Sequence, residues 1–381
     1  MTKVPYAYPW DLVGDPAAAE RIAGLGADAV ALAASYHTTR AATPSHPNHR
    51  MVTAARAACY VPIRPSEWRG RLVPPAPTWV DGPDSFGVAR ESLRSVGLPV
   101  HAWTVLTHST YLGSAHQDLA VRNAFDDVYP YALCPSNEDV AEYCATLVRE
   151  IVKLGDLDGI ILEACGPLGF FHGGHHEKTD GADWDKVQQQ LLSLCFCAGC
   201  VLRYAKVGVD PVELRASVKS TVDGAVPSSV EEALGADLAA RLSEARTAVA
   251  ADLRSLLVNE IRALAPSIAI SLHGNADPWA TGPFATVAPE IREDIDTLVV
   301  SCWPGPEVSV PGIQAMRELA GQDRGVAGYV LALPPRPADA AALRAEFERY
   351  LAAGVDELHV YHAGLASPAR LAAIREALTA L

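Results

Sequence analysis

The sequence predicts an α/β protein, a single (β/α)8 barrel of the TIM type that spans residues 1–381. Short β-branched or apolar runs alternate with longer alanine- and leucine-rich amphipathic segments, which is typical of βα units and a parallel sheet. Eight such runs can be counted. A length of 381 residues also fits one large barrel with insertions.

The eight predicted strands lie within residues 26–37, 54–63, 98–108, 157–166, 267–275, 295–305, 325–335 and 355–365. A doubly wound open sheet is the structural alternative. No GxGxxG or Walker motif accompanies the first predicted strand, which favours the barrel. Residues 241–264 form a clear amphipathic pattern and predict a helix before the fifth strand.

Several connections are longer than a barrel requires. The loops 38–53 and 109–133 follow the first and third predicted strands, and residues 167–240 form a loop-four insertion with helices and a cysteine cluster. Long βα loops in a compact barrel are usually functional. No linker or internal repeat divides the chain, so we expect one domain.

Composition excludes some partners. The net charge of −14 argues against nucleic acid and anionic membranes. No stretch approaches the roughly 20 consecutive apolar residues of a membrane span. The first residues show no charged region followed by an apolar one, so we expect a cytoplasmic protein. The sequence does not indicate an oligomeric state.

Polar and aromatic residues follow most of the predicted strands. In barrels the carboxyl ends of the strands and the loops after them build the active site. Solvent exposure alone would explain one or two of these positions, but not so many at one end. The candidate substrate-binding residues in or just after the strands are Tyr36, His37, His108, His273, Asn275 and His362, with Arg122 in the third loop.

Glu163 ends the fourth predicted strand, after the apolar run "DGIIL". Partial burial raises the pKa of a carboxyl group, which suits a general acid. The alternative is a structural pair with an arginine such as Arg122 or Arg50. Asp277 after strand five and Glu307 after strand six are the candidates for a second carboxylate, although Asp277 is equally suited to cap a following helix.

The loop "HGGHHEK" after strand four carries His172, His175 and His176. Its H-x-x-H-H spacing is not the zincin pattern, and Gly173 and Gly174 indicate a loop. We expect these imidazoles to bind substrate at the barrel mouth. A catalytic metal or merely solvated histidines are the alternatives.

Cys195, Cys197 and Cys200 form a C-x-C-x-x-C motif. Three thiols this close can converge on a tetrahedral zinc ion, which needs one more ligand. The alternative is an amphipathic helix that carries these cysteines incidentally. A zinc ion here would be structural and would clamp the loop-four insertion.

Trp279 and Trp303 lie near the ends of strands five and six. Sugar C–H faces stack on aromatic rings, so both are candidate substrate contacts, with ordinary rim packing as the alternative.

Three segments carry a resemblance to known families: "YPYALCPSNEDVAEY" (129–143), "LDGIILEACG" (157–166) and "LLSLCFCAGC" (191–200). The chain resembles, nearly end to end, a group of bacterial proteins described as alanine-rich or glycoside-hydrolase-like. That group is distantly similar to barrel glycosidases such as the family 42 β-galactosidases. The resemblance implies that Glu163 is an acid/base and that Cys134 is the fourth metal ligand. The nucleophile that those glycosidases carry on strand seven is missing from "GYVLALPPRP".

These observations together predict a glycoside hydrolase-like enzyme that acts on a carbohydrate-like small molecule. Two alternatives stay open: a histidine- or metal-assisted lyase, isomerase or hydrolase, and a carbohydrate-binding pseudo-enzyme.

Overall fold

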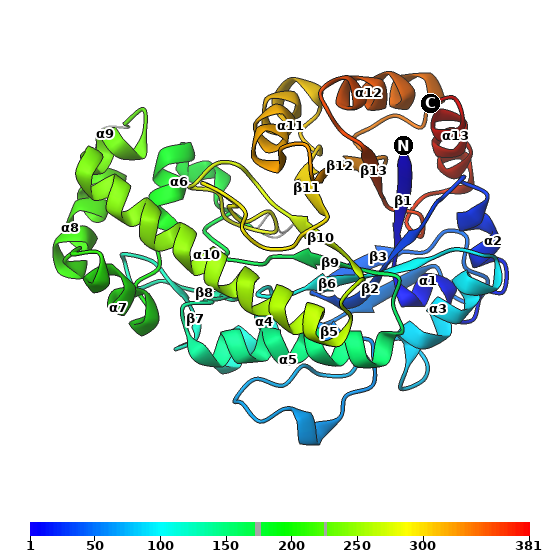
Figure 1. The fold of residues 1–381 in the computed structure, drawn as a ribbon, viewed down its shortest axis with the longest axis horizontal. Coiled ribbons are helices and arrows are strands. Elements are labelled where there is room, and N and C mark those ends of the chain that lie inside the picture. Colours follow the sequence, from blue (N-terminus) through cyan, green and yellow to red (C-terminus); the bar gives the residue numbers. More distant parts are fainter. Residues whose placement is uncertain (172–176, 225–226) are drawn as a thin grey trace.

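A computed structural model describes residues 1–171, 177–224 and 227–381; His172, His175 and His176 lie outside them. Eight parallel strands close into a barrel, because the first strand pairs with both the second and the last (Figure 1). The barrel strands are β1 (Thr2–Ala7), β2 (Val30–Tyr36), β6 (Val100–Val105), β9 (Gly159–Glu163), β10 (Ala269–His273), β11 (Thr297–Ser301), β12 (Gly325–Leu331) and β13 (Glu357–Tyr361). The predicted fold class is confirmed.

Two strand assignments from the sequence were wrong. The first barrel strand is β1, which was not predicted, and residues 54–63 do not form a barrel strand. That segment contributes only β5 (Ala58–Cys59), which pairs antiparallel with the end of β2. One strand was missed and one was wrongly counted before Glu163, so Glu163 still ends the fourth barrel strand.

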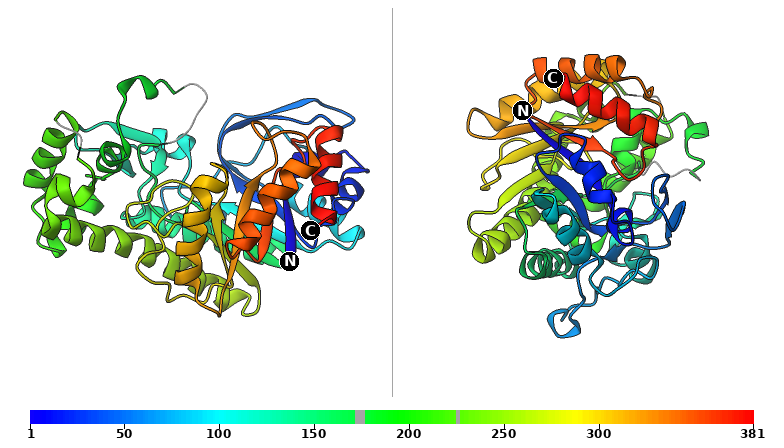
Figure 2. Two further views of the ribbon diagram at one scale, coloured as in Figure 1. Left: turned by 90° about the horizontal axis from the view of Figure 1, so that it is seen from above. Right: turned by 90° about the vertical axis from the view of Figure 1, so that its right-hand side faces the viewer.

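Helices cover the outside of the barrel (Figure 2). They are α1 (Pro9–Leu12), α2 (Ala18–Ala23), α3 (Ser85–Ser95), α5 (Glu138–Gly155), α10 (Ala236–Leu264), α11 (Pro306–Ala320), α12 (Ala340–Ala352) and α13 (Pro368–Thr379). The predicted helix over 241–264 is the greater part of α10. It buries Leu242, Val249, Leu253, Leu257 and Ile261, at helical spacing, and packs against α5. The connection 274–296, which is described throughout, contains no helix.

The insertions follow the carboxyl ends of the strands. Hairpin β3 (Thr39–Ala42) and β4 (Met51–Ala54) follows β2, and α4 (Thr110–Ala115) with hairpin β7 (Ala120–Arg122) and β8 (Val128–Leu133) follows β6. After β9 come α6 (Lys186–Leu192), α7 (Ala198–Lys206), α8 (Pro211–Val222) and α9 (Val230–Leu234). Figure 1 shows these four helices, in green, gathered at one side of the barrel. In the described residues no helix is both long and apolar enough to cross a bilayer.

The barrel interior is lined by rings as well as aliphatic side chains. The Tyr6 ring lies 4.8 Å, between centroids, from both Trp103 and Tyr329, and it also faces His273 and His359. These residues come from five different strands. The barrel interior therefore contains polar atoms along its axis, below the carboxyl end of the strands, where Glu163 lies.

Candidate active site

Glu163 is a buried carboxyl group, 6% exposed, at the carboxyl end of β9. Trp103 Nε1 donates a hydrogen bond of 2.6 Å to its Oε2 atom, and His273 Nδ1 lies 3.5 Å from the same oxygen. Burial raises the pKa of Glu163 to about 7, and the hydrogen bond from Trp103 opposes this only in part. The group is therefore able to hold a proton near neutral pH.

No lysine or arginine in the described parts of the chain forms an ion pair with Glu163. The two arginines considered as structural partners bind elsewhere. Arg122 donates to the carbonyl oxygen of Asp126, and Arg50 donates to the carbonyl oxygens of His46 and His49. The alternative in which Glu163 is half of an arginine pair is therefore wrong.

A wall of tyrosines surrounds this carboxyl. The hydroxyl groups of Tyr8 and Tyr361 lie 3.2 Å apart, and Tyr36 hydrogen-bonds to both. Tyr329 stacks beneath Trp303, with 5.5 Å between ring centroids and 18° between the planes. Trp303 is 38% exposed, so one ring at this end faces solvent, while Tyr8, Tyr36 and Tyr329 are buried and Tyr361 is partly buried.

The predicted histidines occupy three kinds of environment. His37 and His108 stack on each other with centroids 4.3 Å apart, and His37 also stacks on Tyr36. His273 lies inside the barrel beside Glu163. His362 is fully buried and stacks on Tyr8, and its Nδ1 accepts from the backbone N–H of Gly364. It therefore holds the Tyr8 ring in place.

The two candidates for a second carboxylate have other partners. Asp277 Oδ2 lies 2.9 Å from Lys186 Nζ, and its Oδ1 accepts from the backbone N–H of Trp279. Asp277 thus caps a turn, not the helix expected there. Glu307, in the first turn of α11, is 84% exposed in its side chain and pairs with Arg349. In the described residues, neither carboxylate contacts Glu163.

Other predicted substrate contacts are engaged in packing. Trp279 is buried, with the Arg246 guanidinium 5.6 Å from its ring. The Asn275 side chain accepts from the backbone N–H of Asp277. Arg122 belongs to hairpin β7–β8, where its backbone carbonyl accepts from Phe196. Through these contacts the three residues stabilise the loops around the barrel mouth.

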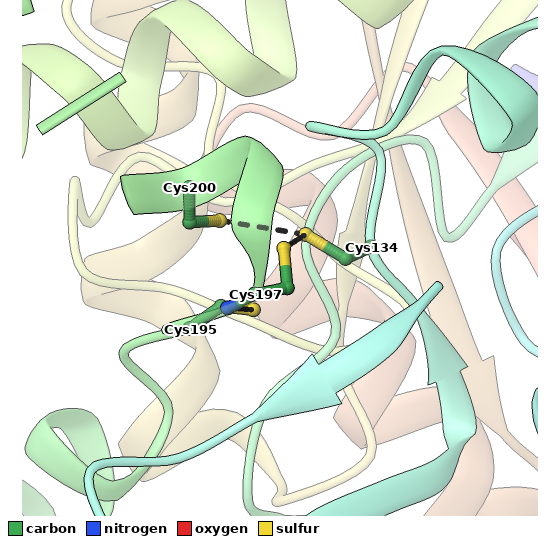
Figure 3. Close-up of side chains that lie close together, drawn as sticks. All are labelled: Cys134, Cys195, Cys197 and Cys200. Atoms are coloured by element: carbon green, nitrogen blue, oxygen red, sulfur yellow. Dashed lines mark hydrogen bonds between the residues drawn. The ribbon is translucent and has the colours of Figure 1, made fainter. Parts of the chain in front are cut away.

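Four buried cysteines converge at the edge of the loop-four insertion (Figure 3). Cys134 directly follows β8, Cys195 and Cys197 precede α7, and Cys200 lies in its first turn. Their Sγ atoms all lie within 4.8 Å of one another. The amphipathic-helix alternative is therefore wrong for the set as a whole, since only Cys200 lies on the helix and all four side chains are buried.

The surroundings of the cluster favour a thiolate at Cys197, whereas the pKa values of Cys134 and Cys200 are raised. Hydrogen bonds from Cys134, Cys195 and Cys200 hold the pKa of Cys197 far below its usual range. Backbone N–H groups of Arg122 and Cys197 point at Cys195 Sγ, and Asn137 Nδ2 lies 3.7 Å from Cys197 Sγ. Four buried thiols with N–H donors around them are a donor set that suits a structural metal.

No family model matches the chain, and no curated protein matches it in sequence. Solved structures match its fold. The PgaB (BpsB) glycoside hydrolase domain from Bordetella bronchiseptica superimposes with a TM-score of 0.60 at 16% identity, over 98% of each chain. The α-L-fucosidase isoenzyme 2 from Paenibacillus thiaminolyticus gives 0.59 at 13%, and the β-galactosidase from Marinomonas ef1 gives 0.57 at 10%, each over 100% of this chain.

The chain spans 49% of the fucosidase and 59% of the β-galactosidase chain. At these identities the likeness establishes the fold, a barrel shared with glycoside hydrolases. Residues Tyr6, Tyr8, Tyr329 and His359 were missed by the sequence prediction. A polar residue inside an apolar barrel strand is the signal that could have found His359.

Proposed function

We propose that the chain is a glycoside hydrolase-like enzyme that acts on a glycoside or sugar-like small molecule, with Glu163 as its general acid/base. The observation that carries the proposal is the state of this carboxyl: buried at the barrel mouth, not paired with any lysine or arginine of the described residues, and with a pKa raised to about 7. A protonated carboxyl in that position can donate to a leaving oxygen. The exposed ring of Trp303 supplies a surface on which a sugar can stack.

Hydrolysis also needs a nucleophile or a base. In the described residues neither candidate carboxylate contacts Glu163, because Asp277 is paired with Lys186 and Glu307 with Arg349. One carboxyl is sufficient when the substrate brings its own nucleophile, as in substrate-assisted hydrolases. The proposal therefore favours substrates with such a group beside the anomeric carbon. Asp277 is the protein alternative, since its partner Lys186 is 78% exposed and water screens an ion pair of this kind.

The test is a panel of aryl glycosides, with 2-hydroxy and 2-acetamido sugars in matched pairs. We expect release of the aryl group from at least one pair, with a preference for the acetamido member. Saturable binding of sugars with no hydrolysis across the panel would instead support the carbohydrate-binding pseudo-enzyme, which the engagement of both candidate carboxylates favours. The histidine-assisted alternative depends on His172, His175 and His176.

We further propose that Cys134, Cys195, Cys197 and Cys200 hold a structural zinc ion. The fit rests on four buried sulfur donors and on the N–H groups around them. The buried Arg246 lines the same cavity as Cys195 and Cys200 and supplies a positive charge beside the sulfur donors. Such an ion would tie the insertion at 167–240 to hairpin β7–β8 and would take no part in the chemistry. Elemental analysis of purified protein should give about one zinc per chain.

A further inference from the structure

The barrel interior contains a continuous line of polar side chains that begins at Glu163. His273 Nδ1 lies 3.5 Å from Glu163 Oε2, and His273 Nε2 lies 3.1 Å from the Tyr6 hydroxyl. That hydroxyl lies 3.0 Å from His359 Nδ1, and His359 Nε2 lies 3.4 Å from Glu357 Oε2. Glu163 ends β9 whereas Glu357 begins β13, so in this parallel barrel the line connects opposite ends.

We propose that this line sets the direction of the hydrogen bonds from Glu357 to His273, so that Glu357, acting through His359, Tyr6 and His273, holds the proton on Glu163. The four are positioning residues, because none of them is required to touch the substrate. The catalytic meaning of the inference rests on the proposed function, whereas the protonation of Glu163 can be tested without a substrate.

The direction of the hydrogen bonds follows from the Glu357 carboxylate, at the end of the line opposite to Glu163. A Glu357 carboxylate only accepts, so His359 Nε2 carries a hydrogen and its Nδ1 is an acceptor. The Tyr6 hydroxyl then donates to His359 Nδ1 and accepts from His273 Nε2–H. His273 Nδ1 is left as an acceptor without a hydrogen-bond partner in the described residues, 3.5 Å from Glu163 Oε2. The carboxyl can satisfy that nitrogen only in its protonated form, the form that a general acid needs.

The reverse direction is disfavoured by burial. It would require an imidazolium at His359 and a charged carboxylate at Glu163, both of which are buried in the barrel. Separated charges in such a site cost far more than neutral groups that hydrogen-bond to one another. The line is therefore stable in the direction that keeps both histidines neutral and Glu163 protonated.

The groups around both ends agree with this assignment. Besides His273, Glu163 is faced by neutral hydroxyl and indole groups from five strands: Tyr6, Tyr36, Trp103, Tyr329 and Tyr361. At the lower end Thr297 donates to Glu357 Oε1, and His101, with Asp158 near it, faces Glu357 and His359. Although burial opposes it, the contacts with His359 and Thr297 keep the pKa of Glu357 below its usual value.

The experiment follows the Glu163 carboxyl directly by 13C NMR of protein labelled at the glutamate side-chain carboxyl, with the signal assigned by its loss in Glu163→Gln. Tyr6→Phe cuts the line at its centre with little change in shape. His273 is then free to carry a hydrogen on Nδ1 and to stabilise the Glu163 anion. We expect the midpoint of Glu163 to fall by roughly one pH unit. Glu357→Gln should shift it in the same direction, and the matched control Tyr350→Phe, a buried hydroxyl outside the line, should not.

An unchanged midpoint in folded Tyr6→Phe would overturn the proposal, as would 15N spectra that show His273 with its hydrogen on Nδ1 in the unmodified protein. If Tyr6→Phe does not fold, Glu357→Gln decides, since its side chain lies at the barrel edge and is 22% exposed. A shifted midpoint without glycosidase activity would retain this inference and remove the proposed function.

Discussion

Glu163 at the barrel mouth and Cys197 at the edge of the loop-four insertion are buried to almost the same extent, 6% and 5% exposed. Their protons are nevertheless held in opposite ways. Burial raises the pKa of Glu163, whereas hydrogen bonds from three neighbouring thiols lower the pKa of Cys197. The comparison teaches that burial alone does not decide the charge of a group. What decides it is how far the surroundings stabilise the anion: three thiols do so at Cys197, whereas at Glu163 the hydrogen bond from Trp103 offsets the effect of burial only in part.

The largest expected effect concerns the carboxyl side of this comparison. Glu163→Gln keeps the shape of the group and removes its titratable proton. General acid catalysis typically contributes 10²–10⁴-fold, so we expect kcat on an aryl glycoside to fall by about that factor with folding intact. The loss should be smaller for substrates with good leaving groups, which need less protonation.

Glu307→Gln is the matched control, because that carboxylate is exposed and paired with Arg349. It should keep activity within about twofold. Equal losses in the two variants, or an unaltered rate in Glu163→Gln on a true substrate, would contradict the acid role.

The next largest effect lies on the thiolate side. Cys197→Ser removes one sulfur from the proposed zinc site, and loss of a structural metal belongs to the few changes that cost about 4 kcal/mol or more of unfolding free energy. Bound zinc should fall with it, while Cys144→Ser, also buried but outside the cluster, should keep its metal. Denaturant unfolding and elemental analysis measure both quantities. Protein from zinc-replete medium that contains no zinc would refute this side of the comparison.

A smaller effect is the pH dependence of stability that Glu163 imposes. Its pKa is about 7 in the folded chain and near 4.5 unfolded, so the folded state binds the proton more tightly. The contribution of this group to stability is complete below pH 4.5 and is lost as the pH rises through 7. A difference of this size corresponds to roughly 3 kcal/mol. The glutamine variant should therefore gain stability relative to the unmodified protein between pH 5 and 8, and parallel unfolding curves for the two would argue against a raised pKa.

The sequence predicted the barrel and the place of Glu163 because strand periodicity and strand ends are local properties. It missed β1 since "TKVPYA" is short and contains a proline, and it over-interpreted 54–63, where an apolar run packs in a loop. The partners of Asp277 and Glu307 could not be predicted, because Lys186 and Arg349 are brought to them only by the folded chain. Convergence of Cys134 with the C-x-C-x-x-C motif likewise depends on tertiary contact, although the family resemblance had implied it.

The smallest effect that we predict concerns Trp303, the exposed ring that packs against Tyr329 and Tyr361. Its ring lies 4.8 Å from that of Tyr361 and stacks on Tyr329, so its inner face is already supported while 38% of the residue stays open to solvent. Aromatic stacking contributes about 0.5–1.5 kcal/mol, so Trp303→Ala should weaken sugar binding by roughly two- to tenfold. The chemical step should change little, because Trp303 has no contact with Glu163 in the described residues. Leu202→Ala, which removes an exposed side chain from α7, serves as the control and should bind as the unmodified protein does. Equal affinities for Trp303→Ala and its control, measured by calorimetry, would show that the sugar does not stack there.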